Sequence, residues 1–108
     1  MKDLKISTEL ISSVLAKETR HLTYDTIYVE DNFIIFSYEG EYQFEVNIYE
    51  FAFKCKEWAR VIYDTTISSS LYKNYAKSWN IDKDKSYTAK TEVEVIIEAC
   101  NWILKEEK

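Results

Sequence analysis

The sequence predicts an α+β protein in which an antiparallel sheet is covered by helices on one face. Between residues 26 and 46 apolar and polar side chains alternate with a period of two, as in half-buried strands. The flanking segments repeat apolar residues every three or four positions, which is typical of amphipathic helices. With 108 residues, 46% of them hydrophobic, the chain has the size of one domain over residues 1–108. A three-stranded meander plus one or two further strands, covered by helices, is the simplest two-layer arrangement.

The first predicted helix covers residues 8–18. Its apolar side chains follow the spacing i, i+1, i+4, i+5, namely Leu10, Ile11, Val14 and Leu15. Ser7 precedes the first turn, where its hydroxyl can accept one of the free backbone N–H groups as an N-cap.

Three strands, Thr26–Glu30, Phe33–Ser37 and Glu41–Val46, form the predicted meander. Gly40 is the only glycine of the chain, and it stands at the second break. We predict a three-residue loop over residues 38–40, with Gly40 in a left-handed conformation, because this loop keeps the two faces of the meander chemically distinct.

This loop pairs Ser37 with Glu41, and Phe36 with Tyr42. One face of the meander then carries the apolar side chains Ile27, Val29, Ile34, Phe36, Tyr42, Phe44 and Val46. The other face carries polar and acidic side chains beside three large apolar ones, namely Glu41, Gln43, Glu45, Tyr28, Phe33 and Ile35.

Two capping boxes open the longer helices. Asn47 and Glu50 form the first box, and Thr91 and Glu94 form the second. Each box is followed by an apolar stripe at helical spacing: Ile48, Phe51, Ala52, Cys55 and Ala59 in a helix from 48 to about 60, and Val93, Ile96, Ile97, Cys100, Ile103 and Leu104 in a helix to about 105.

Between these helices the patterns are mixed. Residues 61–68 are rich in β-branched side chains and predict a fourth strand, and Ser86–Lys90 predicts another short one. Over residues 71–81 the apolar spacing favours a short helix or an irregular arm, although Tyr75 and Trp79 also fall on alternating positions.

Composition excludes several kinds of chemistry. A single glycine excludes the glycine-rich loops that hold phosphates, and a single histidine excludes a histidine-rich metal site. We interpret His21 as a cation near a helix C-terminus, and Cys55 and Cys100 as reduced core thiols rather than as a disulfide or a Cys–His pair. No cofactor, metal or catalytic residue is therefore predicted. The net charge of −5 also argues against binding to duplex nucleic acid.

The negative charge is concentrated in one segment. Between His21 and Phe53 there is no lysine or arginine, but there are seven acidic residues. One interpretation is a solvated face whose charges protect the edge of the sheet from aggregation. The other is a surface that attracts a basic protein partner, in the way that nucleic-acid phosphates attract such a protein. The candidate partner-binding residues on this part of the chain are Glu39, Glu41, Glu45, Tyr28, Phe33 and Ile35.

Residues 72–79 interleave aromatic and cationic side chains. Tyr75 and Trp79 are candidates for a protein contact, where such side chains are enriched. Core packing of the rings and base stacking with a single-stranded nucleic acid are the alternatives.

Two segments resemble helices of small uncharacterised phage and prophage proteins. Residues 47–59 contain Cys-x-x-Trp after a cap, and residues 91–104 contain Cys-x-Trp after a cap. Together they make up about a quarter of the chain. The resemblance implies an accessory protein of mobile-element origin, and it brings no catalytic residues with it.

We therefore expect a small acidic accessory protein that acts without catalysis by binding another protein. The most specific version of this hypothesis is an inhibitor of a host protein. Because no long apolar run or leader is present, we expect a cytoplasmic location without a membrane partner. The alternatives are a homodimeric structural factor that buries Phe33 and Ile35, and a small hydrolase that uses a pair of carboxylates.

Overall fold

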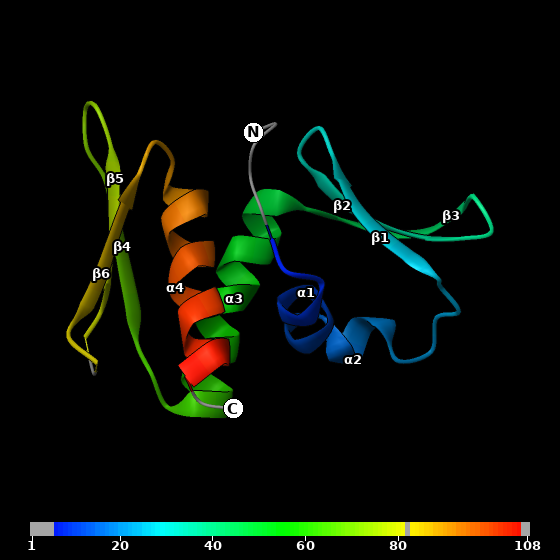
Figure 1. The fold of residues 1–108 in the computed structure, drawn as a ribbon, viewed down its shortest axis with the longest axis horizontal. Helices are drawn as coiled ribbons and strands as arrows, with labels where there is room; N and C mark the ends of the chain where they lie inside the picture. Colours follow the sequence, from blue (N-terminus) through cyan, green and yellow to red (C-terminus); the bar gives the residue numbers. More distant parts are fainter. Residues whose placement is uncertain (1–5, 82, 107–108) are drawn as a thin grey trace. The chain divides into compact units, whose positions relative to one another are not determined.

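The computed structural model describes residues 6–81 and 83–106 (Figure 1). Its helices and strands are α1 (Thr8–Val14), α2 (Ala16–Thr19), β1 (Thr26–Glu30), β2 (Phe33–Tyr38), β3 (Glu41–Asn47), α3 (Ile48–Tyr63), β4 (Ile67–Leu71), β5 (Ala76–Asn80), β6 (Lys85–Ala89) and α4 (Glu92–Glu106). The predicted α+β class with antiparallel strands is confirmed. The strands form two three-stranded sheets, β1–β2–β3 and β4–β5–β6, whereas the sequence favoured a single sheet.

The chain divides into two compact units, Met1–Phe51 and Ala52–Lys108, and each unit contains one sheet. Helix α3 begins at the end of the first unit and continues through the second. Among the residues that the structure describes, no helix is long and apolar enough to cross a membrane.

The first predicted helix is interrupted at Leu15, so residues 8–18 do not form one continuous helix. The N-cap is confirmed, because the Ser7 hydroxyl accepts the N–H of Leu10 at 3.0 Å. The carbonyl of Leu15 accepts both the N–H of Thr19, at 3.0 Å, and the Thr19 hydroxyl, at 2.8 Å. A threonine hydroxyl bonded to the carbonyl four residues earlier bends a helix, which accounts for the change from α1 to α2.

The three strands of the meander are confirmed, but the predicted turn between β2 and β3 is wrong. Tyr38 lies opposite Glu41, so the loop has only two residues, Glu39 and Gly40, with φ of 51° and 81°. Two positive φ angles are the pattern of a type I′ turn, whose twist matches the twist of the flanking strands.

The shorter loop shifts the pairing of β2 with β3 by one residue, and a β-bulge in β3 restores the predicted assignment of side chains to the two faces farther along the strands. Ser37 lies opposite Tyr42, but Phe36 lies opposite Phe44, so β3 has one extra residue at this point. Tyr42 therefore leaves the apolar face on which it was predicted, and its side chain is 60% exposed. Glu41 pairs with Tyr38 and leaves the predicted acidic face.

Helix α3 has the predicted cap and the predicted buried stripe. The side-chain oxygen of Asn47 accepts the N–H of Tyr49 at 2.8 Å. The helix runs past residue 60 to Tyr63 and ends at Asp64, whose φ of 52° is left-handed. The fourth strand therefore begins at Ile67 rather than at residue 61, because hydrogen bonding in the helix overrides the β preference of the branched side chains.

Residues 71–81 form neither a helix nor an irregular arm. They form the end of β4, the turn and β5 of a hairpin. Of the two spacings seen in the sequence, the alternation with a period of two is therefore the one that describes this segment. Ala76, Ser78 and Asn80 are buried on the face toward α4, where the Ser78 hydroxyl donates to the Val95 carbonyl at 2.9 Å. The strand predicted at 86–90 is β6, one residue earlier.

Helix α4 has eight buried side chains. The Thr91 hydroxyl accepts the N–H of Glu94 at 3.2 Å, which confirms the cap. All six side chains of the predicted stripe are buried, and so are Val95 and Ala99. The Cys100 thiol donates to the Cys55 carbonyl on α3 at 3.6 Å, so α4 packs between α3 and the sheet β4–β6.

Candidate functional site

The sheet β1–β3 has one apolar face, which forms the core of the first unit. Directly opposed residues form two rows across the strands, Ile27–Phe36–Phe44 and Val29–Ile34–Val46. Figure 1 shows α1 and α2 on one side of this sheet. Phe36 is fully buried, and its ring contacts those of Tyr24 and Phe44 edge to face, with centroids 4.9 and 5.8 Å apart.

The opposite side of the same strands is the candidate site, which we call the outer face. The pairing places its residues in three rows, Thr26–Ser37–Tyr42, Tyr28–Ile35–Glu45 and Glu30–Phe33–Asn47. Tyr28 is 40% exposed and Phe33 is 37% exposed. Large apolar side chains at the centre of three strands, with carboxylates beside them, are the composition of a protein interface.

The carboxylates of the three outer-face rows belong to Glu30 and Glu45. Partial desolvation, followed by the charge of Glu45 and a hydrogen bond to it, raises the pKa of Tyr42. The carboxylate of Glu45, a hydrogen-bond acceptor, therefore lies next to the aromatic ring of Tyr42. Such a pair suits a lysine or arginine of a partner, which can bond to the carboxylate and lie on the ring.

The hairpin tip is held by Asp25. Its carboxylate accepts the N–H of Glu39 at 3.2 Å and the Thr26 hydroxyl at 3.0 Å, while its own N–H donates to the Ser37 carbonyl at 2.9 Å. Asp25 thus joins the start of β1 to the turn after β2. This acidic residue has a structural role, and it positions the end of the outer face.

The structure brings together four of the residues predicted for partner binding, Tyr28, Phe33, Ile35 and Glu45. Glu39 lies in the turn, and Glu41 lies opposite Tyr38, so neither belongs to the outer face. Tyr42 was missed. Its place follows from the two-residue turn, and the dipeptide Glu39-Gly40 was the sequence feature that could have indicated it.

The predicted residues Tyr75 and Trp79 belong to the second unit. Tyr75 stacks on Tyr72 at the β4–β5 turn, with ring centroids 4.9 Å apart and an interplanar angle of 21°. Trp79 lies on β5 with the ammonium of Lys77 5.1 Å from its ring centroid. Core packing does not describe the tyrosines, because both are more than two-fifths exposed.

Nucleophilic chemistry has little support in the geometry. Both cysteines are free and buried, as predicted, and burial followed by the neighbouring Cys100 raises the pKa of the Cys55 thiol well above its ordinary value. Buried thiols with raised pKa values are poor nucleophiles. His21 is exposed and accepts a hydrogen bond from Arg20 at 3.2 Å. Within residues 6–81 and 83–106, no group of acidic, histidine and cysteine side chains could hold a metal ion.

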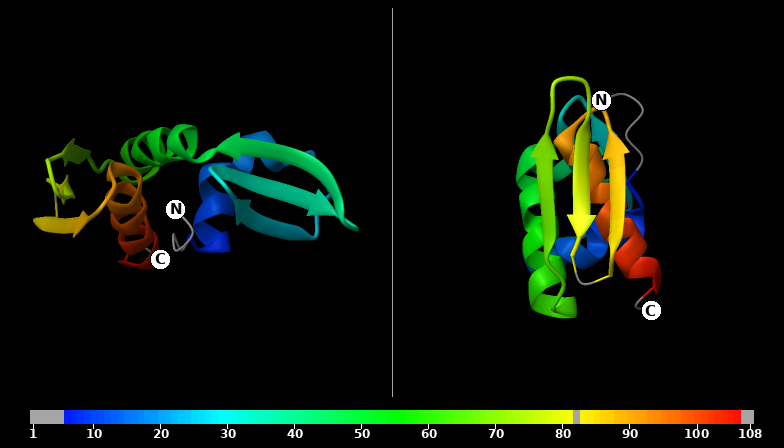
Figure 2. Two further views of the ribbon diagram at one scale, coloured as in Figure 1. Left: turned by 90° about the horizontal axis from the view of Figure 1, so that it is seen from above. Right: turned by 90° about the vertical axis from the view of Figure 1, so that its left-hand side faces the viewer.

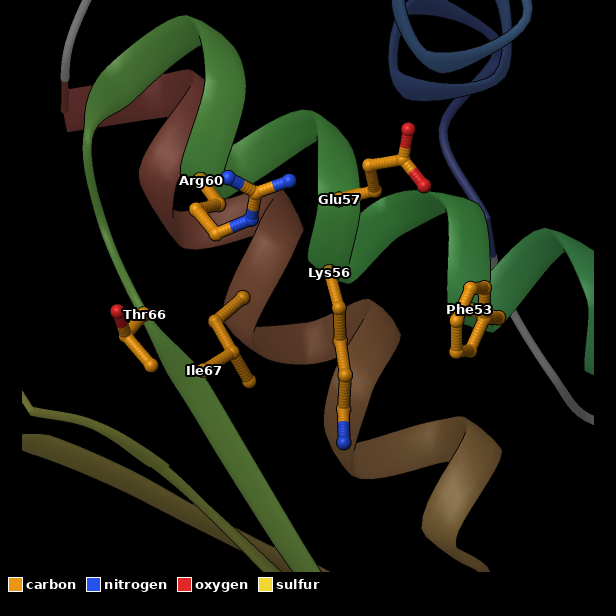
Figure 3. Close-up of a pocket in the computed structure, with 6 residues that line it drawn as sticks. All are labelled: Phe53, Lys56, Glu57, Arg60, Thr66 and Ile67. Atoms are coloured by element: carbon orange, nitrogen blue, oxygen red, sulfur yellow. The ribbon is translucent and has the colours of Figure 1, made fainter.

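The described residues of the second unit line at least two hollows. The first, of about 220 Å³, lies along α3 and the start of β4 and is lined by Phe53, Lys56, Glu57, Arg60, Thr66 and Ile67 (Figure 3). The second, of about 450 Å³, lies at the β5–β6 end of the sheet and is lined by Lys77, Trp79, Asn80, Ile81, Asp84, Lys85 and Ser86. Among the described residues, Glu57 is the acidic residue in the lining of the first hollow and Asp84 is the acidic residue in the lining of the second.

Comparison of the chain with protein-family models, with curated proteins and with solved structures finds no match.

Proposed function

We propose that this protein is a phage-type accessory protein that acts without catalysis and binds a basic surface of another protein through its outer face. The observation that carries the proposal is the row Tyr28–Ile35–Glu45 beside Glu30 and Phe33, in a segment without lysine or arginine between residues 22 and 52. The apolar side chains would lose contact with water when the partner binds, and the carboxylates would attract the partner and fix its orientation.

The charge of the chain supports this choice of partner. The first unit carries four basic and ten acidic residues, whereas the second carries ten basic and nine acidic residues. A basic surface is therefore attracted specifically to the first unit, and the attraction weakens as salt is added. A host protein that binds nucleic acid has such a surface, and occupying it would inhibit that protein.

The resemblance of residues 47–59 and 91–104 to phage and prophage helices supports the accessory role. A homodimer through the outer face is less favourable, because a two-fold arrangement brings Glu30 and Glu45 close to the same carboxylates of the second copy. Like charges placed opposite one another at an interface cost several kcal/mol.

The test uses the full chain as bait in a host lysate, and then the purified captured protein in a direct binding assay. Glu45→Lys is expected to abolish binding, because it reverses the charge at the centre of the outer face. Glu41→Lys makes the same change on the same strand but off that face, so binding should fall only slightly. Equal losses for the two variants would show that net charge alone matters, and unchanged binding of both would refute the outer face as the site.

A further inference from the structure

The sheet β4–β6 has one face that no described helix or strand of its own unit covers, and we call this face the platform. Pairing across the three strands places Ser68–Trp79–Ser86 in one row and Ser70–Lys77–Thr88 in the next. On both sides of the central strand the neighbours are small hydroxyl residues. The side chains of Lys77 and Trp79 lie between these small residues, and both are half-buried.

The other face of this sheet is occupied by α4. Ala76, Ser78 and Asn80 alternate with the platform residues of β5 and are buried, and Ser78 bonds to the α4 backbone. The right-hand view of Figure 2 looks directly onto the three strands, with α3 and α4 behind them. Among the described residues of the second unit, no helix or strand lies in front of the platform in that view.

Aromatic rings and a cation alternate over β5 and the residue before it. Lys77 and Trp79 are two residues apart in β5, so they lie on one face, and Tyr75 immediately precedes the strand at the same spacing. At about 3.3 Å per residue, the Tyr75 and Trp79 positions are about 13 Å apart, with Lys77 midway. Tyr72, paired with Tyr75 across the turn, extends the first ring into a stacked pair whose outer surfaces are exposed.

The local charge of this sheet is opposite to that of the chain. Residues 67–90 contain five lysines and two aspartates, although the whole protein has a net charge of −5. Of the acidic side chains, Asp84 lies at the β5–β6 turn, in the lining of the hollow beside Trp79. No acidic residue stands among the six paired residues of the two platform rows.

We propose that the platform binds single-stranded nucleic acid. One unpaired base stacks on Trp79 and another on the Tyr72–Tyr75 pair, and the ammonium of Lys77 contacts a phosphate between them. Bases present their flat faces only when they are unpaired, which excludes a duplex ligand at the same rings. An acidic peptide would satisfy the lysine, but it would leave the two ring platforms without partners.

The contact between Lys77 and Trp79 is compatible with this role. In the free protein the ammonium lies over the ring, an arrangement worth only about 0.5–1 kcal/mol at an exposed site. A base can therefore displace the lysine from the ring, and the released ammonium is then available to the adjacent phosphate. The hollow of about 450 Å³ beside Trp79 and Ser86 gives the displaced groups room.

The experiment measures the binding of a fluorescent oligothymidylate on the order of ten nucleotides long to the full chain, at salt concentrations between about 50 and 200 mM. Trp79→Ala should weaken binding roughly 5- to 100-fold, the usual effect of removing a base-stacking side chain, whereas Trp79→Phe should retain most of it. Lys77→Glu should weaken binding and reduce its dependence on salt. Lys105→Glu makes the same charge change on the exposed surface of α4 and should alter the affinity less than two-fold, which serves as the matched control.

Three results would overturn the proposal. The first is absence of oligothymidylate binding at the lowest salt concentration. The second is equal binding of wild-type protein and Trp79→Ala, provided that both show the same circular dichroism spectrum. The third is equally strong competition by inorganic polyphosphate or polyglutamate, because these polyanions have no bases and their success would show that charge alone is recognised.

Discussion

Replacing Asn80 by leucine should stabilise the protein, which is unusual for a substitution in a core. Asn80 is 2% exposed and lies on the α4 face of β5, opposite Ile67 and Lys85. Among the described residues, neither its side-chain nitrogen nor its side-chain oxygen has a hydrogen-bond partner. A buried donor or acceptor without a partner costs about 1–3 kcal/mol.

Leucine has the same branching at Cγ but no polar atoms, so Asn80→Leu removes that cost and adds apolar burial. Its larger volume offsets part of the gain, because overpacking a core costs about 1–3 kcal/mol. We expect the free energy of unfolding to rise by about 1–2 kcal/mol. For a domain of this size that is a rise in Tm of about 4–10 °C.

The assay is thermal and urea unfolding followed by circular dichroism. The matched control is Ser78→Ala, two residues away on the same buried face, which loses the bond to the Val95 carbonyl and should lower the free energy of unfolding by about 1 kcal/mol. If Asn80→Leu destabilised the protein as much as the control does, the cost of the unpaired amide would not exceed the cost of the larger side chain, and the expected gain in stability would be refuted.

Three further predictions concern stability and reactivity. Gly40→Ala should lower the free energy of unfolding by about 1–2 kcal/mol, because φ is 81° while no atom within 4 Å opposes the added methyl group; a neutral effect in urea unfolding would contradict this backbone argument. Burial, followed by the charge of Glu94, raises the pKa of Glu98, so the folded state binds this proton more tightly than the unfolded state does. Stability should therefore fall as pH rises above the ordinary carboxyl pKa, and Glu98→Gln should raise Tm at neutral pH but not at acidic pH, with equal shifts at both contradicting the argument. The thiols of Cys55 and Cys100 should not react with Ellman's reagent until the protein unfolds, and rapid labelling of the native protein would show that they are accessible.

Local patterns in the chain predict the starts of α1, α3 and α4 and the three strands of the first sheet, but not the turn between β2 and β3. The caps at Ser7, Asn47 and Thr91 depend on atoms no more than three residues away, and each forms the expected hydrogen bond. Where two local patterns compete, as over residues 71–81, the choice depends on what the segment packs against. Here Ser78 and its neighbours pack on α4, and the strand pattern prevails.

The candidate site shows the same division. Alternation alone places Tyr28, Phe33 and Ile35 on the outer face together with Glu45, because a strand exposes every second side chain to one side. The prediction placed Glu41 on the outer face and missed Tyr42, because Glu39-Gly40 fits a two-residue turn as well as the end of a three-residue loop, and the compensating bulge has no signal of its own in the sequence.

By itself, the amino-acid sequence determined the helix caps, the strand periodicity and the separation of negative charge from the rest of the chain. All of these are properties of neighbouring residues, and short-range hydrogen bonds and side-chain spacing are sufficient to set them. The tertiary structure decided that the strands divide into two sheets, and that Lys77 and Trp79 lie on the face of β4–β6 opposite α4. Those outcomes depend on contacts between residues far apart in the chain, such as the hydrogen bond from Ser78 to Val95. The spacing of neighbouring residues cannot predict the energies of such contacts.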